Sequence, residues 1–95
     1  MAIDRAERMA ERKGRVVAVF GEALAAPVFD LLELTEMAWH DSYGEITPPE
    51  DIVDDILLCS EGEMAKLIRA ARLAVIDRRD LKIWALETLS RVVGR

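Results

Sequence analysis

The chain has 95 residues, of which 52% are hydrophobic and 33% are charged, and its formal net charge at pH 7 is −5. A chain of this length is expected to form one domain, residues 1–95, with a single modest core. The net negative charge argues against nucleic-acid binding, which needs an excess of Lys and Arg, and no run of about 18 apolar residues supports a membrane span.

The charged residues are segregated along the chain. Neither Lys nor Arg occurs between Arg15 and Lys66, whereas twelve acidic residues do. The segments on either side carry all thirteen basic residues. We therefore expect an acidic middle between two basic ends, and this layout gives a dipole that would orient binding partners.

The first helix is predicted from Ile3 to Leu24. Arginines at i, i+3, i+7 and i+10 form one stripe of this helix, and a neighbouring stripe is acidic. The arginines are Arg5, Arg8, Arg12 and Arg15. The expected buried side consists of Ala6, Ala10, Val16, Val17, Phe20 and Leu24. Because proline fits the first turn of a helix, a break at residues 25–27 and a second helix from Pro27 to His40 are predicted.

A loop from Asp41 to Ile46 leads to a short third helix. Thr47 and Glu50 form a capping box and Pro48 suits a first turn, so this helix is predicted from Pro48 to Leu58. Its expected core residues are Ile52, Val53, Ile56 and Leu57. Its acidic residues Asp51, Asp54 and Asp55 are expected to face solvent.

Two further helices complete the chain. A second capping box at residues 60–63 starts a fourth helix, predicted from Glu61 to Ile76, whose apolar residues, Ile68 among them, follow a helical period. Asp77 or Asp80 is expected to cap a fifth helix that ends near Val93. The apolar residues of the fifth helix cover well over half of its circumference, whereas one packed neighbour needs a stripe of about 100°. We predict an all-α, compact bundle of about five helices, two of them longer, with a short acidic third helix.

Two acidic signatures lie on consecutive predicted helices. Glu33-x-x-Glu36 and Asp51-x-x-Asp54 each place two carboxylates one turn apart, and carboxylate oxygens bind Mg²⁺, which can hold the phosphates of a nucleotide. The arrangement resembles the ExxE…ExxD pattern of the all-α, MazG-like nucleoside triphosphate pyrophosphohydrolases, with Asp51 where Glu is usual. This resemblance, confined to about residues 31–58, implies nucleotide hydrolysis with these four residues as magnesium ligands. The other interpretation is that the acids are solvated and stabilise helix dipoles.

The segment from Trp39 to Tyr43 concentrates residue types that are frequent in binding hot spots. Trp39, His40 and Tyr43 are therefore candidates for contacts with a partner, although a core position for Trp39 and a turn position for Tyr43 are the simpler interpretation. Adjacent His, Asp and Ser residues do not make a catalytic triad, which needs convergence in space. The fifth helix supplies the other candidates because of its excess of apolar residues. These candidates are Ile83, Trp84 and Leu86.

The leading hypothesis is an all-α protein that acts by association with another protein and has no catalytic activity. Its simplest form is a homodimer in which the acidic middle meets the basic ends, although these ends can also neutralise the acids within one chain. No cofactor is expected, and Mg²⁺ enters only with the pyrophosphohydrolase hypothesis. A third hypothesis is an antitoxin or immunity protein whose acidic surface binds a basic partner. The lone cysteine, Cys59, and the lack of a signal peptide indicate the cytoplasm.

Overall fold

The computed structural model describes residues 5–45 and 48–94. These residues form five helices with short connections and contain no strand. The helices are α1 (Arg5–Phe20), α2 (Glu22–Tyr43), α3 (Glu50–Ser60), α4 (Met64–Ile76) and α5 (Arg78–Val93). The predicted all-α bundle of about five helices is confirmed, and the acidic α3 is the shortest, with 11 residues. Within the described ranges, no helix combines the length and the hydropathy that a membrane-spanning segment needs.

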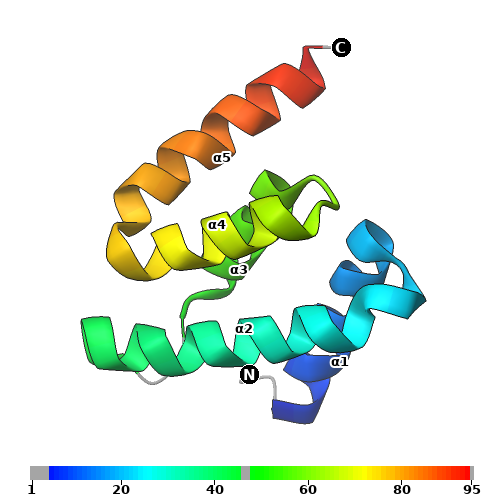
Figure 1. Ribbon diagram of the computed structural model, residues 1–95, viewed down its shortest axis with the longest axis vertical. Helices are drawn as coiled ribbons and strands as arrows, with labels where there is room; N and C mark the ends of the chain where they lie inside the picture. The colour runs from blue at the N-terminus through cyan, green and yellow to red at the C-terminus, as the bar shows by residue number, and fades with distance from the viewer. Residues whose placement is uncertain (1–4, 46–47, 95) are drawn as a thin grey trace.

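The fourth helix has the central position in the packing. Figure 1 shows α4 between α2 and α5, with α3 behind it and the last turns of α5 extending away from the other helices. α1 packs against α2, and α3 packs against both α4 and α5. All five helices contribute to the core. Its largest fully buried side chains include Val16, Val28, Leu32, Trp39, Ile56, Leu67 and Leu81.

The boundary between the first two helices differs from the prediction. α1 ends at Phe20 and α2 begins at Glu22, whereas the break was predicted at residues 25–27. Gly21 separates the helices with a φ of 83°, a conformation that residues with a Cβ rarely adopt. Pro27 lies inside α2, where it removes one hydrogen bond to the carbonyl of Ala23. Because Pro27 and Ala23 are both exposed, that carbonyl lies on the solvent side of the helix.

The next two helices begin later than predicted. α3 starts at Glu50, two residues after the predicted start, and Thr47, the predicted cap, lies outside the described residues. α4 starts at Met64 and not at Glu61. Glu61 and Gly62 have φ angles of 49° and 77°, so this left-handed turn delays the helix. The fifth helix begins as predicted, after a cap.

Asp77 is that cap. Its Oδ1 accepts hydrogen bonds from the backbone N–H groups of Arg79 and Asp80. An aspartate at this position satisfies two donors that the first helical turn leaves without partners. The sequence predicts either Asp77 or Asp80 as the cap, and in the structure the cap is Asp77.

Several predictions about which side chains are buried were wrong, and one of them concerns Leu24, which was expected on the buried side but is exposed. Ala6 and Ala10 are exposed, whereas Arg12 is only 2% exposed. Asp55, expected to face solvent, is also buried. The reason is the same for Arg12 and Asp55, because a charged side chain becomes compatible with burial when an opposite charge lies against it. Val16 occupies the core as expected.

Candidate functional site

Three helices meet at an ion-pair network around one guanidinium group. Arg12 of α1 donates hydrogen bonds to Glu36 of α2 and to Glu50 of α3, the latter at 2.9 Å. Arg15 donates to the second carboxylate oxygen of Glu50 at 2.6 Å and lies 3.2 Å from Asp54. Because α1 is the first helix and α3 the third, this network ties the start of the chain to its acidic middle.

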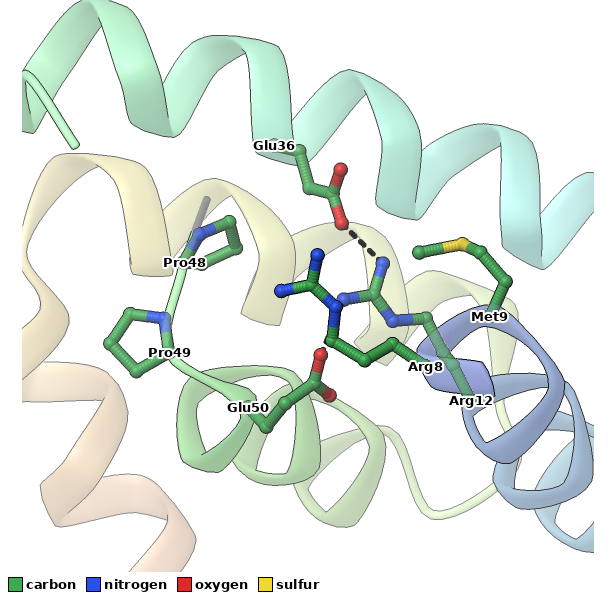
Figure 2. Close-up of a pocket in the computed structure, with 7 residues that line it drawn as sticks. All are labelled: Arg8, Met9, Arg12, Glu36, Pro48, Pro49 and Glu50. Carbon is green, nitrogen blue, oxygen red and sulfur yellow. Dashed lines mark hydrogen bonds and ion pairs between the residues drawn. The ribbon is translucent and has the colours of Figure 1, made fainter. Parts of the chain in front are cut away.

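A pocket of about 220 Å³ lies beside this network. Figure 2 shows Arg8 and Arg12 pointing into the space between Glu36 and Glu50, with Met9, Pro48 and Pro49 completing the lining. Burial alone would lower the pKa of Arg12, but its hydrogen bonds to the two glutamates raise that pKa above its ordinary value. Arg8 forms no ion pair with a described residue and its Nε is buried without a hydrogen-bond partner, whereas both glutamates are paired with Arg12 or Arg15. The arrangement is therefore suited to holding the helices together.

The structure gives the four predicted magnesium ligands different neighbours. Glu36 and Asp54 are paired with arginines of α1. The Oδ2 of Asp51 lies 3.9 Å from the Nζ of Lys82, and Glu33 is exposed. Among residues 5–45 and 48–94, no group of three or more His, Cys, Asp or Glu residues is placed to hold a metal ion. Magnesium binding by these residues stays a prediction, and it would require the cation to displace basic side chains.

Trp39 and Tyr43 form a small aromatic cluster between helices. Their ring centroids are 4.2 Å apart, and the guanidinium carbon of Arg78 lies 5.6 and 5.2 Å from them, a favourable cation–π arrangement. The Nε1 of Trp39 donates to a carboxylate oxygen of Glu45 at 3.2 Å, and the hydroxyl of Tyr43 donates to the backbone oxygen of Ala74 at 2.9 Å. Trp39 is fully buried, so in this structure it occupies a core position.

The other predicted contact residues lie closer to solvent. His40 is exposed, and its Nδ1 lies 2.9 Å from the backbone oxygen of Glu45. On α5, Ile83 and Leu86 are 54% and 58% exposed, whereas Trp84 is half-buried. Successive helical residues are rotated by about 100°, which places Trp84 and Leu86 on nearly opposite sides of α5. The α5 candidates therefore do not form one patch.

Two apolar grooves follow α4, one on each side. The groove toward α5 has a volume of about 680 Å³, and the groove toward α2 about 300 Å³. Ile68, Arg72 and Ile76 line both grooves. The first groove is completed by Ala65, Arg69, Leu73 and Trp84, and the second by Leu31, Leu34, Thr35, Ala38, Ala71 and Val75. We call the surface formed by these two grooves the α4 face.

Sequence reasoning did not find the α4 face. The helical spacing predicts a buried position for Ile68, yet Ile68 is 54% exposed, and Ile76 is 62% exposed. The apolar stripe of α4 is wider than the surface that its neighbours cover. A usable signal was present on α2, where Leu34 and Met37 lie among acidic residues away from the core stripe. No protein-family model, curated protein or solved structure matches this chain.

Proposed function

We propose that this protein functions by binding another protein through the α4 face. The observation that carries the proposal is that Leu34, Ile68 and Ile76 are each more than half exposed along two adjoining grooves. Removing apolar surface from water on binding contributes about 25 cal/mol of favourable free energy per Å². Contiguous apolar surface with a polar rim is typical of protein interaction sites.

Charge supports the same proposal. Arg69 and Arg72 are exposed beside the apolar side chains, and neither takes part in an ion pair with a residue that the structure describes. Charges at the rim of an interface speed the encounter and reject partners of like charge. The α4 face therefore suits a partner whose contact surface combines apolar with acidic side chains. The proposed compartment is the cytoplasm, since Cys59 is a free, buried thiol.

Site-specific photocrosslinking tests the proposal in living cells that produce the protein at its native level. A photoreactive amino acid at position 68 should give a discrete adduct with one protein partner, and an adduct with another copy of the chain counts as such. The Ile76→Asp substitution should abolish this adduct. Position 86 is the matched control, because Leu86 is as exposed as Ile68 but lies on the far side of α5. Adducts at neither position, or equal adducts at both, would refute the proposal.

A further inference from the structure

The outer side of α2 carries an acidic and apolar stripe. Asp30, Leu34, Met37 and Asp41 follow one another at i, i+4, i+7 and i+11, which places them in a line along the helix, and Glu33 lies next to this line. Leu34 and Met37 are both 61% exposed. The three acids are exposed, and none of them forms an ion pair within the described part of the chain.

The outer side of α4 matches this stripe with the opposite charge. Arg69 and Arg72 are exposed and unpaired within the described ranges, and the two exposed isoleucines of the α4 face flank them. The two arginines are three residues apart, as are Asp30 and Glu33, so each helix presents two like charges one turn apart. Each helix therefore offers two large apolar side chains and a pair of charges, negative on α2 and positive on α4.

The positions of α2 and α4 make this match usable by a second copy of the chain. The two helices lie side by side and run in the same direction, and the hydrogen bond from Tyr43 to Ala74 joins them near their C-terminal ends (Figure 1). Two copies related by a twofold axis that runs parallel to both helices would pack face to face. In that arrangement, α2 of each copy would lie against α4 of the other. Such an interface uses the same surface twice and closes as a dimer.

We infer that the partner of the α4 face is a second copy of this chain. Asp30 and Glu33 of each copy then face the arginines of the other, while the apolar residues of α2 pack on the isoleucines of α4. This inference rests on the proposed function and names its partner. A purely apolar partner would leave Arg69 and Arg72 covered without a counter-charge, which is unfavourable. A nucleic acid would meet the acids of α2, which repel phosphate.

Charge reversal on both helices tests the inference by sedimentation velocity. The wild-type chain should dimerise at micromolar concentration, and its dissociation constant should rise with salt. The variants Arg69→Glu/Arg72→Glu and Asp30→Lys/Glu33→Lys should each dimerise at least tenfold more weakly. An equimolar mixture of the two variants should recover the dimer, because an all-acidic face then meets an all-basic one. If circular dichroism shows that a double variant is unfolded, a single variant takes its place. Arg72→Glu replaces the α4 double variant, and Glu33→Lys replaces the α2 double variant.

The control exchanges Glu11 and Lys13, which are exposed on α1, and it should leave dimerisation unchanged. A wild-type dimer that tolerates both double reversals would overturn this interface and leave the proposed function standing. A wild-type chain that stays monomeric at every concentration and salt would overturn the second copy as the partner. In that case the crosslink at position 68 decides the proposed function independently.

Discussion

Replacing Arg12 with methionine tests whether the ion-pair network holds α1 on the rest of the fold. Methionine retains much of the apolar stem but removes the charge that links α2 and α3. Glu50 keeps Arg15 as a partner, whereas Glu36, with its side chain 19% exposed, loses its cation. Removing one partner of a buried pair costs about 3–5 kcal/mol, and the partial exposure of Glu36 places the expected loss near the lower end, at about 3 kcal/mol. Such a loss is a large part of the stability of a small domain.

Arg15→Met is the matched control, because Arg15 lies on the same side of α1 and its partners are more exposed. The side chains of Arg15, Glu50 and Asp54 are 35%, 40% and 52% exposed, so this variant should lose less than about 1 kcal/mol. Urea unfolding followed by circular dichroism measures both losses. The double variant Arg12→Met/Glu36→Met should recover part of the stability, since no buried charge is then left alone. Equal losses in the two single variants would refute the reasoning.

Three further predictions concern a thiol, a metal and two glycines. Burial, together with a nearby aspartate, raises the pKa of Cys59 from 9.0 to about 12. The folded chain then keeps this proton while the unfolded chain releases it, so the free energy of unfolding should fall as the pH rises from 9.0 to about 12. Urea titrations of Cys59→Ala should show a shallower fall, and an identical slope would contradict the assignment. Mg²⁺ with a nucleoside triphosphate should leave the melting temperature unchanged, because Asp54 already lies against an arginine; a shift that disappears in Asp54→Ala would establish a metal centre instead. A Cβ at Gly14 meets nothing within 4 Å, so Gly14→Ala should raise the free energy of unfolding by about 0.5–1 kcal/mol. Gly62 has a φ of +77°, and a Cβ there would lie 3.0 Å from a backbone oxygen. Gly62→Ala should therefore lower the free energy of unfolding by more than about 1 kcal/mol. If both glycine variants changed this free energy in the same direction, the contrast would be contradicted.

Local pattern is sufficient for the number and type of the elements but not for all of their ends. Apolar residues at helical spacing remain an amphipathic stripe in any topology, and Asp77 caps its helix without help from distant residues. Gly14 and Gly21 give the same signal in the sequence, yet only Gly21 breaks the helix. Tertiary packing decides between them, because an isolated glycine costs a helix only about 1 kcal/mol. The predicted break at residues 25–27 was also wrong, because a helix tolerates an exposed proline, such as Pro27, near its start.

The candidate site depends on contacts that no local spacing reveals. Arginines at helical spacing are expected to face water, but Arg12 meets Glu36 and Glu50, which follow it by 24 and 38 positions in the chain. The exposure of Ile68 is equally non-local, because it depends on how much of α4 the neighbouring helices cover. The excess of apolar residues on α5 was predictable from its sequence. The side of α5 that faces the groove, marked by Trp84, was not.

Most acidic residues in the middle of the chain are neutralised within the molecule by basic residues from its two ends. The internal pairs include Arg12 with Glu36 and Glu50, Arg15 with Glu50 and Asp54, Lys82 with Asp51 and Asp55, Lys66 with Glu61 and Glu63, Arg91 with Glu61, and Arg78 with Glu45. The outward acids of α2 and the two arginines of α4 take no part in this neutralisation. A basic partner that covered the whole acidic middle, as the antitoxin hypothesis requires, would have to compete with these pairs. A second copy, as proposed, would compete with none of them, because it would use only the charges that folding leaves unmatched on α2 and α4.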